Sequence, residues 1–275
     1  MSNQNPSGRN SESANGAGDS RPFGIRPIGH IRTPYTTKFG IPRQPGLVRF
    51  EGRIVFEPEF RNPAALRGLE GFDRIWLIWS FSRNLRDSWT ATVRPPRLGG
   101  SARQGVFATR SPFRPNGLGL SCVELAGIDD AGPKRPVVRV RGMDLADGTP
   151  IFDIKPYIPY ADAFPEAAAG WTASSSWQPI EEVRIGEREL AAVPQRLREG
   201  LVDLLKADPR PAYRREGDDG RVYWVPVDRF AVYFRVAGRV CEVRAVRRLD
   251  DAELAELRET GRIRDDAGLL KGDSP

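Results

Sequence analysis

The 275-residue chain contains very little histidine, cysteine or methionine. With a single histidine, His30, the chain can form no HExxH motif and no histidine metal cluster. A Ser-His-Asp triad is possible only if His30 is its base. We therefore expect no metal site, and a chemistry that depends on positioning a substrate. Cys122 and Cys241 each lie inside an apolar, strand-like run, far apart in sequence, which favours buried free thiols over a disulfide.

Long apolar runs are also absent. The stretch 75–79 (IWLIW) is far shorter than the roughly 20 residues that a membrane helix needs. The polar segment at the N-terminus contains no apolar core of a secretory signal, and its composition is typical of a disordered tail. Together with free thiols, these features predict a cytoplasmic protein without membrane contact.

Acidic residues are missing from two stretches, 20–50 and 88–123, in which every charged residue is basic. The net charge of the whole chain is only +6, so the distribution matters more than the sum. Arginine matches phosphate geometry with a bidentate fork, and these stretches therefore favour a nucleic-acid partner. Salt bridges to acids elsewhere in the chain are the alternative interpretation.

Short apolar segments bounded by Gly, Pro or Asp dominate the first part of the chain. A short helix from Pro63 to Leu69 is expected between them, with Asn62 as its N-cap. Many short strands separated by turn signals predict a closed or sandwich-like β domain rather than βαβ units. The expected strands cover 24–31, 47–56, 74–81, 105–109, 121–128, 137–141 and 151–154.

A second unit follows a segment rich in Ala, Ser and Pro. Residues 193–207 place their leucines on one face of an expected helix. Strands are expected at 221–227, 230–236 and 240–246, and the charged C-terminal stretch is expected to be partly helical around 252–259. The predicted fold class is mainly β, with an N-terminal β-barrel and a small α+β C-terminal domain. The predicted divisions are a disordered tail (1–22), a barrel domain (23–165), a linker (166–184), a C-terminal domain (185–250) and a C-terminal tail (251–275).

No Gly-x-Gly-x-x-Gly motif follows a strand and no Walker loop is present, so a Rossmann nucleotide site is not supported. Four loops nevertheless combine Pro and Gly with Arg, Asn, Gln or Asp, as a preformed ligand pocket requires. Each loop taken alone is typical of an ordinary turn between strands. The loops are 41–46, 93–100, 105–121, and 144–150 leading into 153–157.

Taken together and in this order, these segments resemble the TsaA-like (TrmO) family of S-adenosylmethionine-dependent tRNA methyltransferases. The resemblance extends from about residue 25 to about residue 248, and the RSPFRPN segment is highly specific. The segments that carry it are PIGHIRTPY (27–35), FGIPRQPGL (39–47), LEGF (69–72), RPPRLGG (94–100), FATRSPFRPNGLGLS (107–121), DGTPIFDIKPY (147–157) and DPRPAYR (208–214).

This resemblance implies a homodimer whose barrel binds S-adenosylmethionine without a Rossmann fold. It also implies methylation of N6 of threonylcarbamoyladenosine at position 37 of tRNA, mainly threonine tRNA, reached through the anticodon stem-loop. The family often has a His-Gln pair where this chain has Ser82 and Arg83, so contact through their backbone is expected. The cofactor-binding residues that the resemblance implies are Pro42, Arg43, Gln44, Ser82, Arg83, Arg110, Leu120, Asp144 and Leu145.

The modified nitrogen carries a carbamoyl group and is a poor nucleophile while it keeps its proton, so a carboxylate base would help. Asp153 is the candidate base, with Tyr157 as its orienter. The alternative is a structural pair of Asp153 with Lys155 at a subunit interface. Two other functions stay open: a non-catalytic RNA-binding module of the same fold, and a methyltransferase acting on a different substrate. The candidate phosphate contacts are Arg94, Arg97, Arg103 and Arg114.

Overall fold

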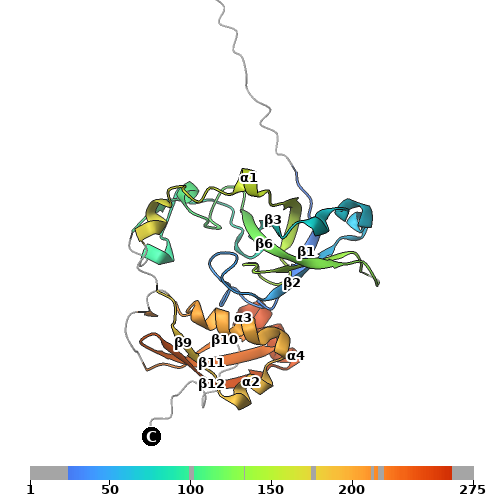
Figure 1. The fold of residues 1–275 in the computed structure, drawn as a ribbon. Coiled ribbons are helices and arrows are strands. Elements are labelled where there is room, and N and C mark those ends of the chain that lie inside the picture. The colour runs from blue at the N-terminus through green and yellow to red at the C-terminus, as the bar shows by residue number, and fades with distance from the viewer. Residues whose placement is uncertain are drawn as a thin grey trace, which may run out of the picture.

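The computed structural model describes residues 24–98, 102–132, 134–174, 178–211, 214–215 and 220–261. Antiparallel strands form a closed barrel in the spatial order β1-β2-β7-β6-β3-β8, which occupies the upper half of Figure 1. The barrel strands are β1 (Gly29–Arg32), β2 (Glu51–Phe56), β3 (Arg74–Ser80), β6 (Leu118–Asp129), β7 (Val137–Arg141) and β8 (Pro150–Pro156).

Alternating apolar residues fill the barrel. Because side chains along a strand point to opposite faces in turn, every second residue of β2 and β3 lies inside. Ile31, Ile54, Ile75, Leu77 and Ile151 are all 0% exposed, and they come from four different strands. Closure leaves no open sheet edge in this part of the fold. The predicted mainly-β fold with an N-terminal barrel is confirmed.

Short elements connect the barrel strands. Between β2 and β3 lie the 3-10 helices η1 (Pro58–Phe60), η2 (Pro63–Leu66) and η3 (Leu69–Gly71). The predicted N-cap is confirmed, since the Asn62 side chain accepts a hydrogen bond from the Ala64 amide at 3.0 Å. Residues 82–117, here called the arm, contain η4 (Ser82–Asn84), β4 (Thr92–Val93), η5 (Pro96–Leu98), β5 (Gln104–Gly105) and η6 (Val106–Ala108).

The strand predicted at 105–109 is wrong. Only β5 at its edge is extended, and 106–108 form the 3-10 helix η6. The Thr109 hydroxyl donates to the Val106 carbonyl at 2.8 Å, and the Arg114 guanidinium donates to the Thr109 carbonyl at 2.6 Å. These local side-chain bonds satisfy carbonyl groups that a strand would pair with a neighbouring strand.

The C-terminal domain combines a mixed sheet, ordered β10-β11-β12-β9, with helices. Its elements are β9 (Glu182–Arg184), α2 (Glu187–Ala192), α3 (Gln195–Lys206), β10 (Tyr223–Val227), β11 (Phe230–Ala237), β12 (Val240–Arg248) and α4 (Asp251–Thr260). The α+β prediction for this domain is confirmed. Strand β9 falls within the expected linker and α4 within the expected tail, and the exact domain boundaries stay a prediction. Helices α1 (Pro159–Asp162) and η7 (Gly170–Ser174) connect the two halves.

Helix α3 lies between the barrel and the second sheet (Figure 1). The Asp203 carboxylate accepts hydrogen bonds from the Arg49 backbone amide and from Nε and Nη2 of its guanidinium, at 2.8–3.1 Å. Gly200 lets the helix approach the barrel, because a Cβ there would lie 2.2 Å from the Phe50 ring. The two domains therefore share one continuous apolar core.

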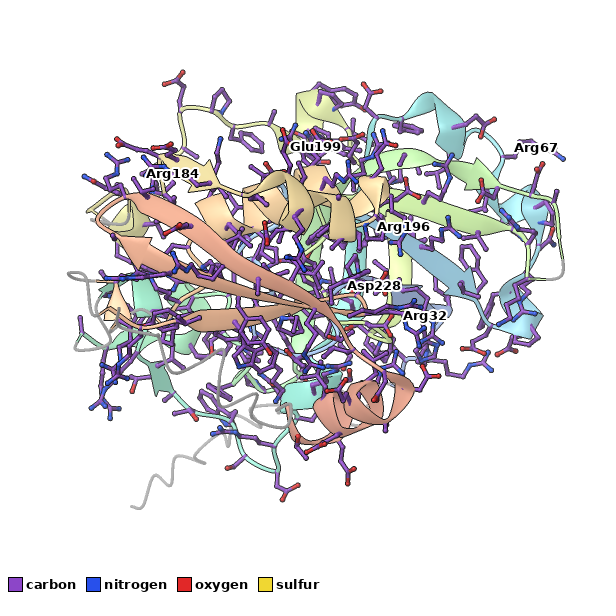
Figure 2. All side chains as sticks on the ribbon, turned by 90° about the horizontal axis from the view of Figure 1, so that it is seen from below. Arg32, Arg67, Arg184, Arg196, Glu199 and Asp228 are labelled. Atoms are coloured by element: carbon purple, nitrogen blue, oxygen red, sulfur yellow. The ribbon has the colours of Figure 1, made fainter. Side chains whose placement is uncertain are left out.

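The turn between β10 and β11 forms a second junction. Figure 2 labels Arg196 of α3 and Asp228 of this turn, which form an ion pair. The Asp228 amide also donates to the Pro34 carbonyl at 2.7 Å, in the loop after β1. The C-terminal domain thus supports a barrel loop that continues into the cavity described next.

Candidate functional site

A cavity of about 450 Å³ opens at one end of the barrel and is called cavity A here. Its walls come from four separate segments of the chain, and these overlap three of the four loops singled out in the sequence. The lining residues fall within 38–44, 79–84, 110–120 and 144–149.

The structure brings together eight of the nine residues that the resemblance assigned to the cofactor. The exception is Leu145, whose side chain is 1% exposed and packs in the core. Its carbonyl accepts a hydrogen bond from the Thr33 hydroxyl at 3.0 Å, so Leu145 holds the loop after β7 on the side away from cavity A. The eight that line cavity A are Pro42, Arg43, Gln44, Ser82, Arg83, Arg110, Leu120 and Asp144.

Close backbone contact holds the loop after β1 in place. The Gly46 amide donates to the Gly142 carbonyl at 2.7 Å. Both glycines have a positive φ, and a Cβ on Gly142 would lie 3.2 Å from Gly46. At the tip of this loop, the Gln44 side-chain oxygen accepts a hydrogen bond from Arg110 at 2.6 Å, which links it to the arm.

Arg83 holds two further walls together. Its guanidinium donates to the Thr36 carbonyl at 2.9 Å and to the Asp147 carbonyl at 2.8 Å. These bonds tie the loop after β1 to the loop after β7, on either side of the cavity. The guanidinium is therefore engaged with the protein backbone, and a ligand contact by Arg83 stays a prediction.

A hydrogen-bonded chain through the buried Ser121 joins two residues that line the floor of cavity A, Trp79 and Asp144. Trp79 Nε1 donates to Ser121 Oγ at 2.9 Å, and Ser121 Oγ donates to an Asp144 carboxylate oxygen at 2.6 Å. Gly119 makes room for the indole, because a Cβ there would lie 2.3 Å from the Trp79 ring. Among the described residues that line the cavity, Asp144 is the only acid.

Burial raises the pKa of Asp144 to about 6. The hydrogen bond from Ser121 and the positive charge of Arg110 act in the opposite direction but do not cancel this effect. An ionised carboxylate in this position carries a solvation cost that a cationic ligand would reduce. The floor of cavity A therefore favours a ligand group that carries positive charge.

A second cavity of about 1130 Å³, called cavity B here, lies directly beside cavity A. Arg43, Gln44, Arg110 and Pro112 line both cavities. Of the candidate phosphate contacts, Arg94 and Arg103 line cavity B.

Two other candidate phosphate contacts are placed differently. The Arg114 guanidinium donates to the carbonyls of Ser111, Thr109 and Val106, so this side chain holds the arm in shape. The side chain of Arg97 lies outside the described part of the structure.

Comparison with known proteins identifies the family. The tRNA-methyltransferase O N-terminal domain matches residues 30–163, and the TrmO C-terminal domain matches residues 177–249. The tRNA (adenine(37)-N6)-methyltransferase of Escherichia coli (strain K12) is 40% identical over 233 residues, covering 82% of this chain and 97% of that protein. This chain belongs to the TrmO family.

Two Pseudomonas aeruginosa proteins extend the comparison. A putative S-adenosylmethionine-dependent methyltransferase, RcsF, is 42% identical over 207 residues, covering 73% of this chain and 87% of that protein. The crystal structure of TrmO from Pseudomonas aeruginosa superimposes with a TM-score of 0.64 at 32% identity, over 82% of this chain and all of that one. The non-Rossmann barrel described above is therefore the TrmO fold.

Sequence reasoning missed Trp79, which lines this TrmO-family cavity, and Ser121, which is buried behind the cavity wall. The burial pattern of β6 places 119, 121 and 123 inside the barrel, so Ser121 is a polar side chain at an inward position. Since a buried hydroxyl needs a hydrogen-bond partner, this feature could have indicated a polar floor.

Asp153, the candidate base, does not line cavity A. It lies on β8, forms an ion pair with Lys155 at 3.0 Å, and lines a separate cavity near Phe60.

Within the described residues, no group of His, Cys, Asp and Glu side chains is arranged to hold a metal ion, and no helix is long and apolar enough to cross a bilayer. Cys122 and Cys241 are free thiols, as predicted, but only Cys241 is buried and Cys122 is partly exposed. Burial raises the pKa of Cys241 to about 12.

Proposed function

We propose that this TrmO-family protein transfers the methyl group of S-adenosylmethionine to N6 of threonylcarbamoyladenosine at position 37 of tRNA, with threonine tRNA as the expected substrate. The observation that carries the proposal is the convergence of eight assigned residues, from four chain segments, around cavity A. The names of similar proteins, a tRNA (adenine(37)-N6)-methyltransferase among them, support the same reaction.

The size and charge of cavity A fit the cofactor. Its volume of about 450 Å³ falls in the range of small-molecule sites, about 300–1,000 Å³. S-adenosylmethionine carries a sulfonium, an ammonium and a carboxylate. Asp144 suits a cationic group, and Arg110 and Gln44 suit the polar carboxylate and ribose, while Leu118 and Leu120 offer apolar surface.

When bound, S-adenosylmethionine supplies an electrophilic methyl group. The protein has to hold that group in line with the attacking nitrogen, an alignment worth several kcal/mol of barrier. The Gly46–Gly142 contact and the backbone bonds of Arg83 hold the walls before any ligand binds. Little ordering cost is then paid on binding.

The N6 nitrogen loses a proton during transfer. Asp144 is the carboxylate among the described lining residues of cavity A, and its raised pKa makes it a better proton acceptor than an ordinary aspartate. Asp153 lines a different cavity and is paired with Lys155, so the proposal does not assign the proton to it.

Two further parts of the proposal rest on the family resemblance: assembly as a homodimer and contact with the anticodon stem-loop. A cytoplasmic location is also proposed, and it rests on the free thiols, which suit a reducing compartment. Contact with RNA gains support from the arginines of the arm, which lie beside cavity A in cavity B. Leu145, which lies behind the cavity wall, is proposed to position Asp144 rather than to contact the cofactor through its side chain.

A pair of arginine variants tests this division of roles. Arg110→Ala should weaken S-adenosylmethionine binding about tenfold and tRNA binding less, because it removes a charged hydrogen-bonding group from cavity A. Arg103→Ala is the matched control: this residue lines cavity B alone, so tRNA binding should weaken while cofactor binding stays unchanged. Calorimetry with the cofactor and filter binding with tRNA give the two affinities.

The outcomes separate the rival functions. No heat of binding with the wild-type chain would favour a non-catalytic RNA-binding module. Cofactor binding without any affinity for tRNA would favour a methyltransferase with another substrate. The opposite order of effects for the two variants would show that the arginines are wrongly divided between the cavities.

A further inference from the structure

Cavity B carries aromatic and cationic side chains on one wall. It is lined by Arg86, Arg94, Arg103 and Arg110 and by the ring of Phe107, all from the arm. The proposed methyl transfer does not use this part of the molecule, apart from the residues shared with cavity A. Its volume of about 1130 Å³ is large enough for more than a single small molecule.

Four of the arginines that line cavity B carry a charge that no carboxylate contacts directly among the described residues. Within the residues that the structure describes, Arg86, Arg94, Arg103 and Arg110 form no ion pair with a carboxylate, and all four are exposed. Arg103 donates a hydrogen bond to the Thr92 hydroxyl at 2.8 Å. Arginines that converge without carboxylate partners raise the local positive potential, which favours an anionic ligand.

Phe107, which lines cavity B, is 75% exposed, and Trp89, which lies next to it outside the lining, is 51% exposed. The two rings are stacked, with centroids 6.1 Å apart and an interplanar angle of 24°. Large aromatic rings are stabilised by burial, so two stacked rings that are both exposed indicate a surface that a ligand covers.

The backbone that carries Phe107 is firmly held. Arg114 donates to the carbonyl groups at both ends of its 3-10 turn, Val106 and Thr109. Trp171 of η7 donates to the neighbouring Ala108 carbonyl at 2.8 Å. The backbone that carries the ring is therefore held before any ligand binds, which lowers the ordering cost of a stacking contact.

We propose that cavity B binds unpaired nucleobases of the RNA strand next to the target nucleotide, with the Phe107–Trp89 pair as a stacking platform and Arg94 and Arg103 at the phosphates. Aromatic faces flanked by arginines are the usual means of binding single-stranded RNA. The inference rests on the proposed function, because that function identifies the strand as a tRNA loop. The shared wall of Arg43, Gln44 and Arg110 places the flanking strand directly beside the cofactor.

A second copy of this chain is the other partner that could cover exposed aromatic rings. The charge of the wall argues against it, because four arginines without carboxylate partners would have to be buried against another protein surface. RNA brings phosphates to those same arginines.

The test uses the full chain and measures tRNA affinity, the KM for tRNA and the affinity for S-adenosylmethionine. Phe107→Ala and Trp89→Ala should each weaken tRNA binding and raise the KM for tRNA about tenfold, since stacking on one base contributes about that much. Cofactor affinity should not change. Phe107→Trp keeps an aromatic face and should restore binding.

Phe164→Ala is the matched control, because Phe164 is also a highly exposed aromatic residue, at 70%, and does not line cavity B. Wild-type tRNA affinity in Phe107→Ala, beside an active wild-type enzyme, overturns the stacking site and leaves the proposed function intact. A change of oligomeric state in Phe107→Ala, seen by sedimentation, also overturns it in favour of a second copy. If the wild-type chain binds RNA through Phe107 but transfers no methyl group, the stacking site stands and the proposed function fails.

Discussion

Asp144 occupies the floor of cavity A at an electrostatic cost. Its pKa of about 6 lies above the ordinary value, so the folded protein binds this proton more tightly than the unfolded chain does. The stability that this difference contributes is complete below about pH 4 and is lost as the pH rises through about 6. At neutral pH the ionised group destabilises the fold, a cost that a cationic ligand can offset.

Asp144→Asn should therefore raise the free energy of unfolding at pH 8, by on the order of 1–3 kcal/mol. The amide oxygen can still accept the hydrogen bond from Ser121, so the packing is conserved. Urea unfolding of both proteins from pH 4 to pH 8 measures the difference, which should grow between about pH 4 and about pH 6 and then level off.

Asp130→Asn is the control, because this carboxylate is exposed, and its difference from wild type should stay flat over the same range. A difference for Asp144→Asn that does not change with pH would show that the folded protein does not raise the pKa of this group.

The two acid-free basic stretches, 20–50 and 88–123, contain arginines with different roles in the fold. In the first stretch, Arg26, Arg32 and Arg49 each form an ion pair with an acid far away in the chain. In the second, Arg94 and Arg103 form no ion pair with an acid among the described residues, and both line cavity B. Composition could not separate these two cases, because the partners come together only when the barrel closes and docks on α3.

At the level of elements, α3 depends on close contact with the barrel. Exposed glycine in a helix usually lowers stability by about 1 kcal/mol relative to alanine. At Gly200 the order should be reversed, because a Cβ would lie 2.2 Å from the Phe50 ring, which is fully buried. Gly200→Ala should lower the free energy of unfolding by about 1–3 kcal/mol, measured by urea denaturation.

Gly71→Ala provides the comparison, since no atom lies within 4 Å of the Cβ position and φ is not positive. That variant should unfold like the wild type. Equal stability of Gly200→Ala and wild type would mean that α3 does not pack against the barrel as described.

Alternation of apolar residues predicted most strands, because each barrel strand has one buried face. The segment 105–109 has a similar composition but folds as a 3-10 helix, since Thr109 and Arg114 bond its carbonyl groups locally. Strand β9 was not expected either. It spans only Glu182–Arg184 and pairs in parallel with β12, a long-range contact that leaves no local pattern.

At the scale of the whole molecule, closure of the barrel brings the residues that line cavity A together. Residues of the assigned set lie up to about a hundred positions apart, and the resemblance alone predicted that they meet in cavity A. Sequence reasoning did not find the Trp79–Ser121–Asp144 chain, the role of Arg83 in bonding two loops, or the position of Asp153 outside the cavity. Each of these depends on strand register and on which face a side chain occupies.

Binding of tRNA should be strongly salt-dependent, because the arginines of cavity B would displace counterions from the RNA. A plot of log affinity against log salt concentration should be linear, and each phosphate contact to a single strand contributes a slope of about −0.7. Arg94→Ala should make the slope shallower by about that amount. A slope near zero for the wild type would contradict electrostatic binding of tRNA.

The central claim is that cavity A holds a methyl donor for position 37 of tRNA. Nucleoside mass spectrometry on tRNA from cells with and without the gene tests it most directly. Loss of the gene should remove methylated threonylcarbamoyladenosine and raise the unmethylated form. The wild-type gene should restore the methylated nucleoside, and the Arg110→Ala gene should restore less of it. Unchanged levels of both nucleosides in the absence of the gene would contradict the claim.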